Sequence, residues 1–153
     1  MNKERINLKK ELFDACGKFV DQREETISHI ITSNQNALTS ETKSSAGDKH
    51  ETGRAMLQLE IEKASQQLKG IHEMRLILSK IKIDDISEVI KLGSVVITNH
   101  GNYFLAISAG EINILGIKYF AVSTASPIGK LLLGKSVENA FYFNHQYIIQ
   151  EVF

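Results

Sequence analysis

The sequence predicts an α+β fold, in which an N-terminal antiparallel coiled-coil hairpin of helices is followed by a small antiparallel β domain with one short helix. Three observations lead to this prediction. Apolar residues recur every seven positions through residues 1–83, short β-branched and aromatic runs fill residues 84–153, and the composition changes between these segments. Fourteen of the 18 basic residues precede residue 84, whereas nine of the 11 aromatic residues follow it. We therefore expect a domain boundary near residue 84.

The first half carries two apolar stripes with the spacing of paired helices. In each stripe, steps of three and four residues alternate, which places the apolar side chains on one face of a helix. Two such helices can bury their stripes against each other, so residues 5–80 are expected to form one hairpin with its tip near residues 40–53. Two helices of a compact bundle are the alternative. The stripes consist of Ile6, Phe13, Val20 and Ile27 with Cys16, Ile30 and Ala37, and of Leu57, Ala64, Ile71 and Leu78 with Ile61 and Leu68.

The second half has the residue types of short strands. Six runs of strand length are separated by short polar connections of the kind that join hairpins. One segment breaks this pattern: in SPIGKLLLGK, Ser126 can cap a short helix, Pro127 fits its first turn and Gly134 can end it. Strands are expected at residues 94–99, 103–108, 111–116, 118–123, 140–143 and 147–153.

Charge, cysteine content and hydropathy exclude several classes of protein. The 18 basic and 18 acidic residues balance, so the chain lacks the positive footprint of a duplex-DNA-binding protein. Cys16 is the only cysteine, which excludes an internal disulfide; its place in an apolar stripe predicts a core position. The charged start has no apolar signal-peptide segment, and no apolar run approaches the ~20 residues that span a bilayer. A cytoplasmic protein with no membrane partner is expected.

Two motifs in this element order resemble the bacterial Gre-family transcript cleavage factors, which bind RNA polymerase. Family members carry Gly-Asp-x-x-Glu-Asn at the hairpin tip; here Gly47, Asp48 and Glu51 match, and Thr52 replaces the asparagine. They also carry a Ser-Pro-hydrophobic-small-basic-x-Leu-hydrophobic-Gly-Lys run near the end, which residues 126–135 match closely. The resemblance covers nearly the whole chain.

The resemblance implies a cofactor of RNA polymerase that is not itself an enzyme. The hairpin would enter the secondary channel of the polymerase, where Asp48 and Glu51 would serve as catalytic and metal-binding residues by helping to hold a second Mg²⁺. That ion would activate the water that cuts the 3′ end of a backtracked nascent RNA, which the protein contacts only indirectly. The resemblance further implies a β domain like that of FK506-binding proteins, which grips the polymerase through Ser126, Pro127, Ile128 and Lys130.

The tip residues also fit a structural role, and the tip departs from the family pattern. Asp48 and Glu51 have the spacing of a capping box, and carboxylates at a helix start also favour the helix dipole. After the glutamate, the family has Asn, a small residue, Glu and Tyr or close variants, whereas this chain has Thr52, Gly53, Arg54 and Ala55. A secondary-channel regulator without cleavage activity is therefore the first alternative function.

The positions of the histidines predict solvent-exposed side chains and not catalytic or metal-binding residues. His50 is expected to be a solvated tip residue, and His29 and His72 are expected to face solvent from the helices. His100 and His145 fall in turns between strands, and no histidine pair has the sequence spacing of a metal site.

The aromatic residues of the second half suggest a partner surface. Neighbouring residues in a strand point to opposite faces of the sheet, so some of these aromatic side chains are expected to be exposed. Two further alternative functions are a prolyl-isomerase-like enzyme, with aromatic side chains lining its pocket, and a coiled-coil interaction protein unconnected to polymerase. The aromatic residues concerned are Tyr103, Phe104, Tyr119, Phe120, Phe141, Tyr142 and Phe143.

Overall fold

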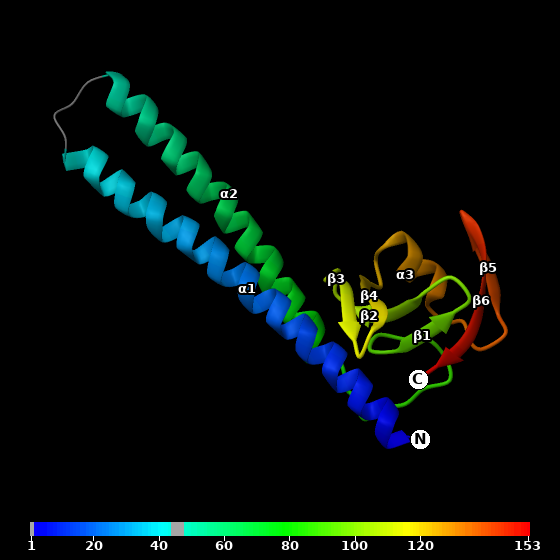
Figure 1. Cartoon of the computed structure of the whole chain (residues 1–153). Helices are drawn as coiled ribbons and strands as arrows, with labels where there is room; N and C mark the ends of the chain where they lie inside the picture. Colours follow the sequence, from blue (N-terminus) through cyan, green and yellow to red (C-terminus); the bar gives the residue numbers. More distant parts are fainter. Residues whose placement is uncertain (1, 44–47) are drawn as a thin grey trace. The chain divides into compact units, whose positions relative to one another are not determined.

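The computed structural model describes residues 2–43 and 48–153, and their side chains except at positions 41–43 and 48–50. The predicted α+β class is confirmed, and the expected strands are present within a few residues of their expected bounds (Figure 1). Within the described ranges, none of the helices combines the length and the apolar character needed to cross a membrane. The elements are α1 (Asn2–Lys43), α2 (Asp48–Ser79), β1 (Val95–Thr98), β2 (Asn102–Ala106), β3 (Gly110–Ile114), β4 (Ile117–Ser123), α3 (Pro127–Leu132), β5 (Ala140–Phe143) and β6 (His145–Val152).

The chain forms two compact units, one of which interrupts the other in sequence. The helical unit comprises Val20–Arg75, and the sheet unit comprises Met1–Phe19 together with Leu76–Phe153. The predicted boundary near residue 84 lies inside the sheet unit, in the segment between α2 and β1. The first turns of α1 therefore belong to the same compact unit as the sheet.

In the helical unit, α1 and α2 lie side by side and run in opposite directions (Figure 1). Their contact uses residues of the predicted apolar stripes, because Val20 and Ile27 of α1 and Ala64 and Ile71 of α2 are buried. At one end of this contact, the guanidinium of Arg75 donates from Nη2 to Asp21 Oδ1 at 2.8 Å and from Nε to Glu24 Oε2 at 3.0 Å. This fork of charge-assisted hydrogen bonds joins the two helices across their seam.

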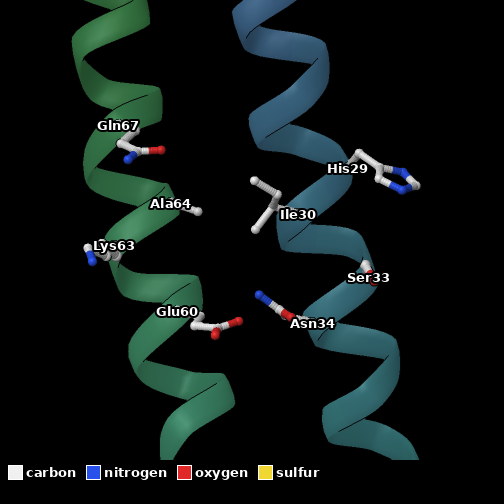
Figure 2. Close-up of a pocket in the computed structure, with 8 residues that line it drawn as sticks. All are labelled: His29, Ile30, Ser33, Asn34, Glu60, Lys63, Ala64 and Gln67. Atoms are coloured by element: carbon white, nitrogen blue, oxygen red, sulfur yellow. The ribbon is translucent and has the colours of Figure 1, made fainter.

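The seam is interrupted by a polar gap on the side of the hairpin tip. Asn34 follows Ile27 by seven residues and so occupies the next position of the α1 stripe, beyond Ile30, which lies opposite the small Ala64 (Figure 2). Figure 2 shows the side chains of Asn34 and Glu60 pointing toward each other across a pocket of about 460 Å³. In the described part of the chain, Asn34 Nδ2 is the buried side-chain nitrogen that lacks a hydrogen-bond partner.

The sheet unit contains a sheet with the strand order β3-β4-β2-β1-β6-β5. The prediction of an antiparallel sheet is wrong at one pair, because β2 and β4 run parallel, with Tyr103 opposite Phe120 and Leu105 opposite Val122. The other neighbouring strands are antiparallel. After β2 the chain passes to the outer edge, forms β3, and returns so that β4 fits between β3 and β2.

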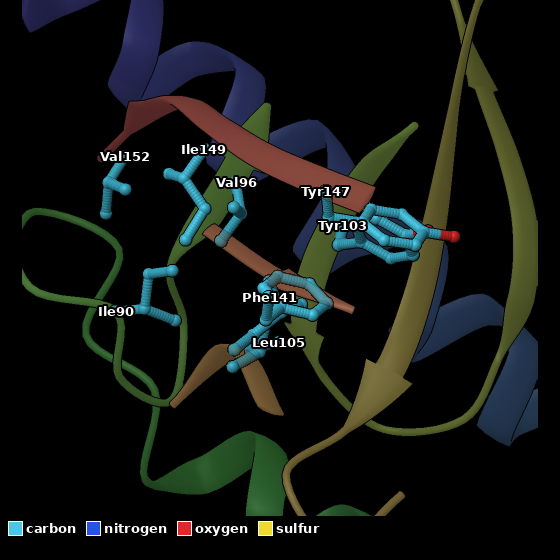
Figure 3. Close-up of a cluster of buried hydrophobic side chains, with 9 residues drawn as sticks. Ile90, Val96, Tyr103, Leu105, Phe141, Tyr147, Ile149 and Val152 are labelled. Carbon is cyan, nitrogen blue, oxygen red and sulfur yellow. The ribbon is translucent and has the colours of Figure 1, made fainter. Parts of the chain in front are cut away.

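Both faces of the central strands are buried. One face carries the cluster of Figure 3, which consists of Ile90, Val96, Tyr103, Leu105, Leu132, Phe141, Tyr147, Ile149 and Val152. Val95, Phe104 and Phe153 alternate with members of this cluster and are also buried. Residues of α1 lie at this second face: the Arg5 guanidinium carbon is 4.9 Å from the centroid of the Phe153 ring. The expected exposure of aromatic residues thus fails for β2 and holds for Phe120 on β4 and Tyr142 on β5.

The turn between β3 and β4 is strained and exposed. Ile114 pairs with Ile117, so Leu115 and Gly116 form a two-residue hairpin turn, and both have positive φ, 51° and 84°. The side chain of Leu115 is 95% exposed. Asn113 Oδ1 accepts a hydrogen bond from the backbone N–H of Gly116 at 2.9 Å, and this bond stabilises the turn.

Candidate functional site

The two acidic residues of the predicted tip site belong to the first turn of α2. The helix begins at Asp48, and Glu51 follows three residues later, which is the spacing of neighbours on one helix face. Glu51 is exposed. The carboxylate of Asp48, its predicted capping contact and the side chain of His50 lie outside the described residues.

The surroundings of these acids determine which cation they can hold. Carboxylates in the first turn of a helix also face the positive end of its dipole, which lowers their pull on a cation. Arg54 is exposed three residues beyond Glu51 on the same helix. Among the described side chains, which leave out those of Asp48 and His50, no cluster of three or more His, Cys, Asp or Glu could hold a metal. Two carboxylates are hard oxygen ligands that suit Mg²⁺, but they make only part of a coordination sphere.

The second predicted site begins at the N-terminus of α3, and its predicted cap is confirmed. Ser126 Oγ accepts the backbone N–H of Gly129 at 3.1 Å and donates to the carbonyl oxygen of Ser123 at 2.6 Å. Pro127 occupies the first turn, where its missing N–H is not needed. Gly134 has φ of +81° just beyond the helix, in agreement with its predicted place at the end.

Gly129 explains the small residue in this motif. A Cβ at position 129 would overlap the carbonyl oxygen of Ser123 and would lie 2.9 Å from Ser126 Oγ. Only glycine therefore allows the end of β4 to approach the helix so closely. This part of the motif therefore has a structural role, which depends on the contact with Ser123 and is not visible in the motif itself.

The four predicted partner-binding residues divide between core and surface. Ser126 caps the helix and is half-buried, and Ile128 packs against the buried cluster of the sheet unit. Pro127 and Lys130 are exposed, as is Leu133 one turn further on. The surface that a partner could contact at α3 and its C-cap therefore carries one proline, one cation and one apolar side chain.

Three features of the structure are not predicted by the sequence. Lys9 is 2% exposed, and its Nζ donates to the carbonyl oxygen of Asp85 at 3.1 Å. Asn34 breaks the helical seam, although the seven-residue spacing from Ile27 could have revealed it. His100 and His145 lie against each other with ring centroids 5.0 Å apart, a contact that a separation of 45 positions in the sequence conceals.

Neither a protein-family model nor a curated protein matches this chain.

Proposed function

We propose that this protein is an RNA polymerase-binding transcription elongation factor of the Gre type. In this proposal, the α1–α2 hairpin inserts its tip into the secondary channel of the polymerase and stimulates cleavage of backtracked transcripts. Asp48 and Glu51 help to position a second Mg²⁺, and the remaining ligands belong to the polymerase and to water. The protein acts in the cytoplasm as a cofactor of the polymerase and meets the nascent RNA only at its 3′ end.

One observation carries this proposal: two acidic residues, Asp48 and Glu51, belong to the first turn of α2, which follows the connection between two long antiparallel helices. A helix of 42 residues is about 63 Å long at 1.5 Å per residue, which is ample to carry a side chain into a deep channel. The exposed Glu51 is free to meet a ligand held by another protein.

The chemistry requires a shared site. When bound, Mg²⁺ would supply the activation of water and the stabilisation of the leaving oxygen. Asp48 and Glu51 can offer it two carboxylates only, so the isolated protein should lack nuclease activity. Arg54, on the same side of the helix as Glu51, reduces the local negative charge.

The sheet unit supplies the anchor in this proposal. We propose that it has the fold of the Gre β domain, which is like that of FK506-binding proteins, and that it grips the polymerase through the Ser126–Lys130 segment. Support comes from the exposed Pro127 and Lys130 on α3 and from Leu133 directly after it, beside a helix cap that holds the segment in one conformation.

A transcript cleavage assay on stalled elongation complexes tests the proposal. The double variant Asp48→Asn/Glu51→Gln should bind polymerase as wild type does but should cleave at a rate lower by orders of magnitude, because an amide is a poorer Mg²⁺ ligand than a carboxylate. Glu62→Gln is the matched control, since Glu62 is exposed on α2 away from its first turn. Equal cleavage by the double variant and the control would reject the metal role.

A secondary-channel regulator without cleavage activity is the second candidate, favoured by the exposed Arg54. The variant Thr52→Asn/Arg54→Glu restores the asparagine and the glutamate of the family pattern and keeps Ala55 in place of the tyrosine. If wild type binds polymerase without cleaving and this variant cleaves, the natural tip belongs to a regulator. If neither binds polymerase in a competition assay, both candidates fail.

A further inference from the structure

The strand β5 lies at one end of the sheet, so one side of its backbone faces away from the other strands. It is the last strand in the order and lies next to β6 (Figure 1). The two strands are antiparallel, with Ala140 opposite Ile148 and Tyr142 opposite Gln146. In such a pair, successive residues direct their N–H and C=O groups alternately toward the neighbouring strand and away from it. The residues that bond to β6 therefore determine which backbone groups of β5 face outward.

Hydrogen bonds of β6 fix this alternation. The backbone N–H of Ile149 donates to the carbonyl oxygen of Asn139 at 3.0 Å, so these two residues face each other. Ile148 and Gln146 turn the other way, since the N–H of Ile148 donates to Asn99 Oδ1 at 2.7 Å and the carbonyl oxygen of Gln146 accepts from Asn99 Nδ2 at 3.2 Å. Asn99 follows β1, which lies on the opposite side of β6 from β5. The backbones of Ile148 and Gln146 therefore bond toward β1 and not toward β5.

Ala140 and Tyr142 consequently direct their backbone groups to the outer edge of the sheet. Each lies opposite a residue of β6 that bonds toward β1, so its own N–H and C=O point away from β6. Both residues are exposed, in agreement with an uncovered edge. The edge is short, because Glu138 and Asn144 on either side have positive φ, 74° and 62°, which ends the extended conformation.

The composition of this edge does not oppose pairing with another strand. Proteins commonly protect sheet edges with charged side chains, proline or bulges. The strand at the other end of the sheet, β3, carries Glu111, which forms an ion pair with Lys118 of β4 at 3.5 Å. By contrast, residues 139–144 have the sequence NAFYFN, with neither a charge nor a proline. Of the two edges of the sheet, β5 is therefore the one suited to accept a strand.

The outer edge of β5 is complementary to itself. When two β5 strands pair antiparallel with Phe141 of each copy at the two-fold axis, Ala140 of one copy lies opposite Tyr142 of the other, twice. This register gives a partner to both N–H and both C=O groups that each copy directs outward. A register centred on Ala140 or on Tyr142 would instead place one of these residues opposite Glu138 or Asn144, where the backbone is no longer extended. The preferred register also sets the small Ala140 beside the Tyr142 ring, which is 72% exposed.

We propose that the β5 edge is a self-association surface, through which two copies of this chain join their sheets by antiparallel β5–β5 pairing. Main-chain hydrogen bonds supply the attraction, and Tyr142 of each copy covers Ala140 of the other. The contact is short and belongs to the class of small, transient interfaces, below about 1,200 Å². The association is therefore reversible and grows with protein concentration. It does not depend on the role proposed at the polymerase.

Sedimentation velocity of the full chain over a range of concentrations, together with amide hydrogen exchange, tests this surface. Wild type should pass from monomer to dimer as the concentration rises, and exchange of the Tyr142 amide should slow in parallel. Tyr142→Lys should weaken the association by about tenfold or more, because it removes the ring and puts a charge on the edge twice in a two-fold contact. Tyr142→Pro removes an outward N–H that β6 does not use, so it should abolish the dimer.

Two exposed apolar residues outside the β5 edge provide the controls. Ile117→Lys changes the opposite end of the sheet and Met56→Lys changes α2, and both should leave the dissociation constant unchanged. A chain that stays monomeric at every concentration would reject the second copy and leave a strand of another protein as the occupant. Dimers that resist Tyr142→Lys, or that disappear in either control, would place the contact elsewhere and so reject the proposal. Exchange at Tyr142 in wild type decides the question even if Tyr142→Pro is poorly folded.

Discussion

The ammonium nitrogen of Lys9 lies 3.1 Å from the backbone carbonyl oxygen of Asp85, so a buried cation of α1 holds the segment that leads into the sheet. The side chain of Asp85 turns to another partner, Lys91, whose Nζ is 2.5 Å from Asp85 Oδ2. Burial lowers the pKa of Lys9, an effect that the charge of Asp85 opposes and that of Lys91 reinforces.

Replacement of Lys9 by methionine should change how stability depends on pH. Because the pKa of Lys9 is lowered in the folded state, the unfolded chain holds this proton over a pH range in which the folded protein has released it. Lys9 therefore makes the free energy of unfolding rise with pH between its lowered pKa and its ordinary value of 10.5. Lys9→Met should remove this rise and should raise the stability at pH 7 by about 1 kcal/mol.

Urea unfolding of both proteins from pH 7 to pH 10.5 measures this difference. Lys10→Met is the control, because Lys10 is the exposed neighbour on α1 and its removal should leave the pH profile unchanged. Parallel profiles for wild type and Lys9→Met would contradict the prediction.

Cys16 should be inert toward thiol reagents while the protein is folded. The residue is fully buried, and burial raises the pKa of its thiol to about 12 from 9.0. Since the thiolate is the reactive form, alkylation at pH 8 should require opening of the sheet unit. Iodoacetamide labelling followed by mass spectrometry should show a rate that increases with urea in step with unfolding, whereas fast labelling without urea would show that Cys16 is accessible.

Replacement of Asn34 by leucine should stabilise the helical unit. The buried Nδ2 of Asn34 lacks a partner among the described residues, and an unsatisfied buried donor costs about 1–3 kcal/mol. Leucine would also fill part of the pocket that Asn34 lines together with Glu60. We expect an increase of about 1–2 kcal/mol in the free energy of unfolding, measured with urea.

The control for this change is Asn36→Leu, since Asn36 is exposed on the same helix and should change stability little. A loss of stability in Asn34→Leu would indicate that Asn34 makes a water-mediated contact with Glu60, because such a contact satisfies the buried amide.

Two glycine-to-alanine changes should have opposite signs. In Gly129→Ala, the new methyl group would overlap the Ser123 carbonyl and crowd the Ser126 cap, so stability should fall by about 3 kcal/mol. In Gly17→Ala, nothing lies within 4 Å of the new Cβ and the position is inside α1, so stability should rise by about 0.5–1 kcal/mol. Thermal unfolding of the two variants beside wild type measures both, and a neutral Gly129→Ala would contradict the close approach.

Local sequence patterns predict the bounds of the helices and strands well, but they do not predict which strands pair with each other. The residues of β5 were predicted at both ends, and Ser126 and Gly134 marked the bounds of α3, because these features depend on residues close in sequence. Alternation identifies a strand but not the strand beside it, so the parallel pairing of β2 with β4 could not be read from the short connection after Ala106.

The candidate sites likewise divide into those made of residues close in sequence, which can be predicted, and those made of residues far apart, which cannot. Asp48 and Glu51 were found because three positions separate them, and Ser126–Lys130 because it is a continuous run. The burial of Lys9 depends on residue 85, and the stacking of His100 depends on residue 145. Contacts of this kind are set by tertiary packing, which a hydropathy pattern does not encode.

The discontinuity of the sheet unit has a consequence for the order of folding. The segment up to Phe19 leaves the ribosome before Leu76–Phe153, yet the two segments form one compact unit. Closing a flexible loop of that length has an entropic cost that grows with the number of loose residues. Pairing of α1 with α2 brings the two ends of Val20–Arg75 together, because Arg75 donates hydrogen bonds to Asp21 and Glu24. This pairing shortens the flexible loop that must be closed before the sheet unit forms. We therefore expect the hairpin to form early in synthesis and the sheet to close last, once Phe153 pairs with Val95.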